Sequence, residues 1–126
     1  MPRIETVRFP DLDRTVHTVH GRFTADDVIE TIRREWTAQP TRDVLWDFCE
    51  ADASALTVDG LRSIVEEVRR HAHRRPGGRT VLVGSDDLVF GVARMHVTYS
   101  EIEHSPIVYH VARSLEEGEK WLEGEA

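Results

Sequence analysis

The sequence predicts an α/β domain with a mostly parallel sheet of four or five strands, an antiparallel hairpin at the sheet edge, and four helices. Three observations support this prediction. Short apolar segments that suit strands alternate with longer segments in which apolar residues recur at helical spacing. The links between them are short, which calls for right-handed crossovers between parallel strands. Two of the strand segments are apolar on both faces, as in a sheet covered by helices on both sides.

The chain opens with a predicted hairpin. Residues 3–9 and 15–21 both alternate weakly between apolar and polar side chains. The segment 10–13, Pro-Asp-Leu-Asp, lies between them and is typical of a turn. We therefore expect two antiparallel strands at one edge of the sheet.

A helix is expected over residues 25–38. Thr24 and Asp27 stand three residues apart, in the arrangement of a capping box at the helix start. The apolar residues of this segment share one face, namely Val28, Ile29, Ile32 and Trp36. Pro40 favours a helix end just before it, because the residue preceding a proline disfavours the helical conformation.

Two further strand–helix units follow. The strand in residues 43–49, DVLWDFC, carries apolar side chains on both faces, and Thr57 caps the helix that comes next. The apolar stripe of that helix consists of Leu61, Ile64, Val65, Val68 and Ala72. The apolar strand in residues 80–84, TVLVG, leads through Asp86 and Asp87 into a helix that runs to about residue 103. A last strand begins after Pro106, and Ser114 and Glu117 form a capping box for a closing helix.

The helix after Asp87 is apolar on two sides. Its expected core stripe contains Leu88, Val92, Met95, Tyr99 and Ile102. A second stripe, on roughly the opposite side, contains Phe90, Ala93 and Val97, with Arg94 beside it. Because a surface helix is normally polar there, we expect this second stripe to be covered by a second copy of the chain, a partner protein or an apolar ligand.

Four segments of the chain resemble the SpoIIAA-like family, which is related in fold to STAS domains. They are VLWDF (44–48), LTVDGLRSIV (56–65), GGRTVLVGSDDLVFGVARM (77–95) and SLEEGEKWL (114–122). The resemblance covers residues 4 to 122 approximately, and it implies a single STAS-like domain over residues 1–126. It also implies that the chain has no catalytic machinery and no cofactor, and it brings no established biochemical role.

Relatives in the anti-sigma-factor antagonist branch carry a serine in an Asp-Ser-Ser-Gly type motif, which a partner kinase phosphorylates. The matching loop of this chain reads ASALT, so Ser54 and Thr57 are its hydroxyls and no glycine follows either. A phosphate at a helix N-terminus is physically sensible, because free N–H groups and the helix dipole favour it. The alternative is that Thr57 simply caps its helix, which is the interpretation that its context favours.

Acidic residues gather where the predicted strands end. In parallel α/β sheets, ligands and partners bind at the carboxyl ends of the strands. The acidic residues expected there are Asp47, Glu50, Asp52, Asp86 and Asp87. Their oxygens suit a divalent cation, but helix capping and solvation explain them equally, and no histidine stands at a metal-ligand spacing beside them. We expect no metal site.

Composition excludes other classes. The chain has 16 Lys and Arg against 23 Asp and Glu, and a net charge of −7 argues against general nucleic-acid binding. Cys49 is the single cysteine, the segment MPRIETVRF lacks the apolar core of a signal peptide, and no apolar run is long enough to span a membrane. We therefore expect a cytoplasmic protein.

These observations favour a non-enzymatic regulatory or protein-interaction module that associates with itself, as a homodimer, or with a protein partner. The alternative is a small protein that binds an apolar molecule or lipid in a pocket under the third helix. An enzyme ranks third, because it would need a metal at the acidic strand ends.

Overall fold

The computed structural model describes residues 3–124, which build one five-stranded sheet in the order β1-β2-β3-β4-β5. The strands are β1 (Ile4–Phe9), β2 (Arg14–Arg22), β3 (Asp43–Asp52), β4 (Arg79–Val83) and β5 (Val108–Ala112). β1 pairs with β2 in the antiparallel direction, and every later pair is parallel. The predicted α/β fold with an antiparallel edge hairpin is confirmed. The predicted domain boundaries at residues 1 and 126 lie outside the described residues.

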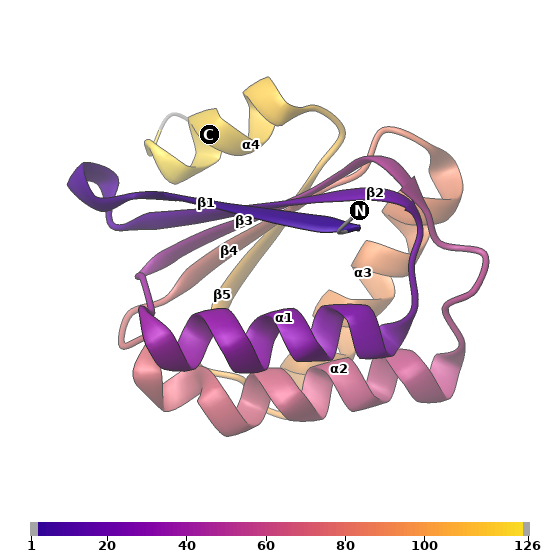
Figure 1. Cartoon of the computed structure of the whole chain (residues 1–126), viewed down its shortest axis with the longest axis horizontal. Coiled ribbons are helices and arrows are strands. Elements are labelled where there is room, and N and C mark those ends of the chain that lie inside the picture. Colours follow the sequence, from indigo (N-terminus) through magenta and orange to yellow (C-terminus); the bar gives the residue numbers. More distant parts are fainter. Residues whose placement is uncertain (1–2, 125–126) are drawn as a thin grey trace.

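The helices are distributed unequally over the two faces of the sheet. They are α1 (Ala25–Ala38), α2 (Val58–His71), α3 (Asp87–Ile102) and α4 (Leu115–Leu122), with short 3₁₀ turns η1 (Pro10–Leu12) and η2 (Ala72–Arg74). Figure 1 shows α1, α2 and α3 on one face and α4 alone on the other. None of the helices within residues 3–124 combines the length and the apolar character that crossing a membrane requires.

Side-chain caps fix the helix starts as the sequence predicts. Thr24 and Asp27 form the full capping box at α1, because each side chain accepts a hydrogen bond from the backbone N–H of the other. Thr57, Asp86 and Ser114 accept from the third residue after each of them. These local bonds place each helix start directly beyond a strand end.

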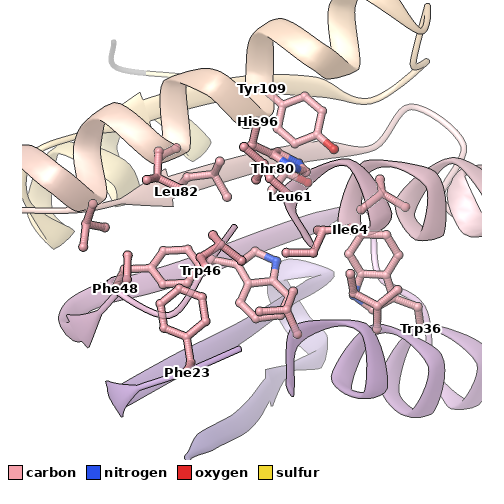
Figure 2. A pocket seen from close by; sticks show the side chains of 18 residues that line it. Phe23, Trp36, Trp46, Phe48, Leu61, Ile64, Thr80, Leu82, His96 and Tyr109 are labelled. Carbon is pink, nitrogen blue, oxygen red and sulfur yellow. The ribbon is translucent and has the colours of Figure 1, made fainter. Parts of the chain in front are cut away.

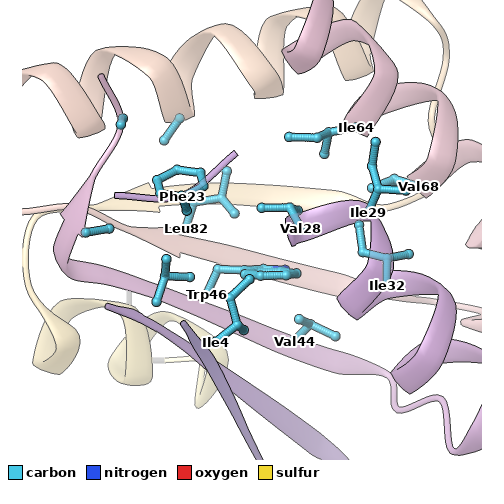
Figure 3. Close-up of a cluster of buried hydrophobic side chains, with 14 of the residues drawn as sticks. Ile4, Phe23, Val28, Ile29, Ile32, Val44, Trp46, Ile64, Val68 and Leu82 are labelled. Atoms are coloured by element: carbon cyan, nitrogen blue, oxygen red, sulfur yellow. The ribbon is translucent and has the colours of Figure 1, made fainter. Parts of the chain in front are cut away.

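β3 forms the centre of two apolar clusters. Its side chains alternate between the faces, so Val44 and Trp46 enter the cluster under α1 and α2, whereas Leu45 enters the cluster under α4. Figure 3 shows Ile32 of α1 and Ile64 of α2 in the first of these clusters. The strand is therefore covered on both sides, as predicted.

Buried charges tie the amino ends of β3 and β4 together. Asp43 is fully buried and accepts paired hydrogen bonds from Arg79 and Arg42. Burial by itself would raise the pKa of Asp43, but these two arginines hold it below its usual value. Arg75, also buried, donates to the carbonyl oxygens of Thr41, Arg42 and Arg79.

The orientation of α3 corrects the sequence analysis. Its buried residues are Val89, Ala93, His96 and Ser100. Leu88, Met95 and Ile102 are 56%, 39% and 64% exposed, so their assignment to the core is wrong. Val92 and Tyr99 are half-buried. The physical reason is that Thr80 and Tyr109 make the surface beneath α3 partly polar, so that polar side chains fit against it better than large aliphatic ones.

Candidate functional site

A cavity lies between the sheet and the three helices α1, α2 and α3 (Figure 2). Its volume is about 60 Å³. We call it the inner cavity, and most of its lining is apolar. Its aromatic lining residues are Phe23, Trp36, Trp46, Phe48 and Tyr109. A concave, mostly apolar site with a few polar groups is the usual form of a small-molecule binding site.

One end of the inner cavity is an aromatic wall. Trp46 and Phe48 both point inward from β3, because they stand two residues apart on the strand, and their rings stack with centroids 5.9 Å apart. Phe23, which precedes the capping residue of α1, packs against Phe48 at 5.5 Å. This end of the cavity offers only apolar contacts and aromatic faces.

The other end of the inner cavity is polar. Thr80 and Tyr109 are direct partners in the β4–β5 register, and both line the cavity. His96 descends from α3 and meets the edge of the Tyr109 ring at a centroid distance of 5.3 Å. No hydrogen bond joins the His96 ring to another described residue, and its nitrogens are not among the atoms that are both fully enclosed and unpartnered. A polar group therefore faces a small cavity without a protein partner.

Burial keeps the polar end uncharged. It lowers the pKa of His96 to about 4, because an imidazolium ion is poorly solvated there. Burial also raises the pKa of Tyr109 to about 12. At neutral pH the His96 ring is therefore neutral, with one nitrogen that donates and one that accepts.

Arg75 lies near this end but does not line the cavity, and its donors are directed at neutral oxygen atoms of the chain. Its guanidinium lies 4.6 Å from the Trp36 ring and donates to the Thr80 hydroxyl at 3.0 Å as well as to backbone carbonyls. Because Thr80 accepts from Arg75, its own hydroxyl hydrogen is free to turn elsewhere. The indole Nε1 of Trp36 is buried without a hydrogen-bond partner among residues 3–124.

Each of the acidic residues predicted at the strand ends interacts with a nearby group of the chain. Asp47 and Asp52 accept hydrogen bonds from the backbone N–H groups of Cys49 and Ser54. Asp86 caps α3, Asp87 forms an ion pair with Arg113 at 2.8 Å, and Glu50 lies 3.9 Å from His20. In the described chain no three His, Cys, Asp or Glu residues are grouped so that they could hold a metal ion.

The two predicted phosphoacceptors have different settings. The Thr57 hydroxyl accepts a hydrogen bond of 2.9 Å from the N–H of Gly60, as a helix cap does. Ser54 is exposed in the loop before it, and its N–H donates to Asp52. Thr57 is exposed as well. Capping therefore accounts for Thr57, and Ser54 has a surface position.

The four residues predicted to form an interaction surface on α3 do not share one exposed face. Ala93 is buried and Val97 packs against the main core cluster. Phe90 is half-buried beneath the guanidinium of Arg113, which lies 3.8 Å from its ring. Of the four predicted residues only Arg94 is exposed. The exposed large apolar side chains of α3 belong instead to Leu88, Met95 and Ile102.

We call the set Leu88, Val92, Met95, Tyr99 and Ile102 the outer face of α3. Its members are separated by four, three, four and three residues, which is the spacing of a coiled-coil seam. Tyr99 lies on the side toward α2, since the Arg62 guanidinium of α2 covers its ring at 5.5 Å, and Val92 is half-buried and also lines the inner cavity. The part of the outer face that is open to solvent therefore consists of Leu88, Met95 and Ile102.

Sequence reasoning missed the polar end of the inner cavity. In the sequence, His96 has no other histidine at a metal-ligand spacing, and Thr80 and Tyr109 belong to no recognisable motif. The available signal was the spacing of Val89, Ala93, His96 and Ser100, which also repeats every three or four residues. That signal is weak, because it contains less apolar surface than the competing stripe.

Comparisons with known proteins identify the fold and nothing finer. No protein-family model matches the chain, and no curated protein matches it significantly. The chain is similar to the crystal structure of an uncharacterized protein of the DUF3478 family from Shewanella loihica PV-4, which has a SpoIIAA-like fold. The similarity has a TM-score of 0.59 at 17% identity and covers 94% of this chain and 91% of the other. The chain thus has a SpoIIAA-like fold, as its sequence predicts.

Proposed function

We propose that this chain is a non-enzymatic regulatory or protein-interaction module, and that it associates with a second copy of itself through the outer face of α3. The observation that carries this proposal is the exposure of Leu88, Met95 and Ile102 on one helix. Large aliphatic side chains aligned in this way expose a contiguous apolar area, and such areas mark interaction sites. The expected cytoplasmic location belongs to the same proposal and rests on the single cysteine, Cys49.

A second α3 fits this stripe better in the antiparallel direction. Next to the outer face stand two small residues, Gly91 and Thr98, and nothing lies within 4 Å of the space that a side chain at Gly91 would enter. Beyond them stand Arg94 and Glu101, both exposed. Antiparallel pairing about a two-fold axis midway between Arg94 and Glu101, level with Val97 and Thr98, would bring Arg94 of each copy toward Glu101 of the other. The charges beside the stripe thus complement themselves.

Charge substitution in the outer face tests this proposal. The double variant Leu88→Glu and Ile102→Glu should be monomeric at concentrations at which the natural chain is dimeric, because both carboxylates would be buried in the interface. Leu12→Glu is the matched control, since Leu12 is also exposed but lies in η1, outside α3. Sedimentation equilibrium from micromolar to millimolar concentration measures the mass. A natural chain that stays monomeric over this range would refute self-association.

The inner cavity favours a second candidate function, the binding of a small apolar molecule. Two tryptophans and two phenylalanines converge on it from α1, β3 and the segment before α1. Native mass spectrometry of gently purified chain should then reveal a retained small molecule that leaves on denaturation. Self-association through α3 does not involve a bound small molecule, so this measurement distinguishes the two proposed functions.

The absence of enzymatic activity is also part of the proposal. Its support is that the acidic strand-end residues serve as caps, turn acceptors and an ion-pair partner. Titration calorimetry with magnesium, manganese and calcium should therefore give no binding heat. Stoichiometric binding that disappears in Asp47→Asn would contradict this part of the proposal.

A further inference from the structure

We infer that the inner cavity selects small, flat apolar molecules that carry one uncharged hydrogen-bonding group, and that His96 recognises this group. This inference rests on the second candidate function and adds a chemical class of ligand to it. It starts from the division of the cavity into an aromatic wall and a polar end (Figure 2).

The polar end lacks the partners that buried polar groups normally have. The His96 side chain is buried, no hydrogen bond joins its ring to another described residue, and its ring nitrogens are not among the fully enclosed unpartnered atoms, so a group in the cavity can reach them. Buried polar groups are nearly always hydrogen-bonded, so each exception needs an explanation. A hydroxyl, amide or carbonyl group of a ligand would supply the missing bond. Thr80, whose hydroxyl hydrogen is free, lines the same cavity and offers a second contact.

The ligand's polar group should be uncharged, because no cationic side chain among residues 3–124 lines the cavity. His96 is neutral at neutral pH, since burial lowers its pKa to about 4. Arg75 is not among the lining residues, and its donors are directed at three carbonyl oxygens and the Thr80 hydroxyl rather than into the cavity. A carboxylate in the cavity would therefore remain without a counter-charge, which is strongly unfavourable in an apolar site.

The ligand should be small, and α3 should move outward to admit it. A volume of about 60 Å³ is well below the roughly 150 Å³ of an apolar cavity that binds benzene. α3 is the wall that moves most easily, because its buried side includes one large aliphatic residue, Val89, with Ala93, His96 and Ser100. The exposed Leu88, Met95 and Ile102 show that solvent lies on its other side. α2, in contrast, is anchored by Leu61, Ile64, Val65 and Val68.

Three probes of similar shape test the inference, namely toluene, phenol and benzoate. Each is titrated at pH 7 into the ¹⁵N-labelled full chain, and dissociation constants are taken from amide chemical shifts. In the natural chain, toluene and phenol should bind with shifts centred on the cavity, and benzoate should not. In His96→Leu the ratio of phenol affinity to toluene affinity should fall about tenfold, because one hydrogen bond to a buried partner is lost.

Two controls keep the result specific. His73→Leu replaces an exposed histidine outside the cavity and should leave the ratio unchanged. His96→Gln retains a neutral donor and acceptor and should restore most of the preference for phenol. Circular dichroism establishes that each variant is folded, and His96→Met replaces His96→Leu if the leucine variant does not fold.

The possible failures are distinguishable. An unchanged affinity ratio in a folded His96→Leu variant would overturn recognition by His96 while leaving apolar binding intact. Preferential binding of benzoate would overturn the uncharged class of ligand. If none of the three probes shifts any amide, the inference and the cavity function both fail, whereas self-association through α3 is unaffected.

Discussion

α2 and α3 are neighbouring helices of similar length on the same face of the sheet, yet they distribute their side chains in opposite ways. α2 buries Leu61, Ile64, Val65 and Val68 and turns its arginines to solvent. α3 buries His96 and Ser100 and turns Leu88, Met95 and Ile102 outward. The difference teaches that α2 anchors the core with aliphatic side chains, whereas α3 places polar side chains toward the core and leaves aliphatic ones exposed.

The two helices also differ in their ionic contacts. Glu67 of α2 is buried and bonded to Arg33 of α1 at 3.0 and 3.1 Å and to His71 at 2.8 Å. Glu103, just after α3, pairs with Arg69 at 3.1 Å, but both side chains are about half exposed. Exposed pairs of this kind contribute little to stability.

The largest expected effect distinguishes the apolar residues of the two helices. Ile64→Ala should lower the free energy of unfolding by about 3 kcal/mol, because it removes buried methyl groups and leaves a cavity. Leu88→Ala should change it by less than about 0.5 kcal/mol, since Leu88 is exposed. Urea denaturation at low micromolar concentration measures both. Equal losses would show that α3 is anchored as firmly as α2.

Protonation of His96, on the buried side of α3, should lower the free energy of unfolding by about 2 kcal/mol at acidic pH. The unfolded chain binds a proton at His96 below about pH 6.5, whereas the folded chain does so only near pH 4. Stability should therefore fall as the pH falls from about 6.5 toward 4, with about 2 kcal/mol lost by pH 5 from this residue. His17, whose pKa burial lowers to about 3, should contribute a similar loss. Between pH 7 and pH 5, the free energy of unfolding of the His96→Leu variant should therefore fall by about half as much as that of the natural chain. Urea titrations at the two pH values measure this. Parallel pH profiles would disprove the role of His96.

Glu67→Gln should cost about 1–2 kcal/mol, because charged hydrogen bonds to a buried carboxylate are lost, although the exposure of Arg33 screens part of the gain. The matched change Glu103→Gln should cost less than about 0.5 kcal/mol. Hydrogen bonding from Arg33 lowers the pKa of Glu67 below 4.5, so its contribution should persist at pH 5 and vanish as the pH falls through that lower pKa. Thermal unfolding at several pH values measures this. A contribution lost already between pH 7 and pH 5 would be inconsistent with it.

The smallest effect concerns one glycine in each helix. Gly91→Ala in α3 should stabilise the chain by about 0.5–1 kcal/mol, because alanine favours a helix interior and the added methyl group meets nothing within 4 Å. Gly60→Ala in α2 should destabilise it, since the added Cβ would lie 2.9 Å from the Cβ of Ala25 in α1. Melting temperatures compare the two variants. A stabilised Gly60→Ala variant would show that α1 and α2 can move apart.

Much of the fold could be predicted from local patterns. The strand–helix alternation, the caps at Thr24, Thr57 and Ser114, and the burial of β3 on both faces all follow from spacing within ten or fifteen residues. The acidic residues predicted at strand ends lie within β3 or just after β4, with Asp47 in the middle of β3. Their bonding, however, depends on loop geometry that no residue pattern specifies, as the Asp87–Arg113 ion pair shows.

The sequence by itself determined the order of the strands and helices and where the helices begin, because caps and hydrophobic periods act between near neighbours, whereas β3 extends to Asp52, beyond the predicted residues 43–49. Only the tertiary structure decided which side of α3 faces the core. That helix carries apolar residues at two sets of helical positions, so periodicity alone could not choose between them. The choice came from residues distant in sequence, since Thr80 and Tyr109 make the surface beneath α3 partly polar and favour His96 over leucine or isoleucine there.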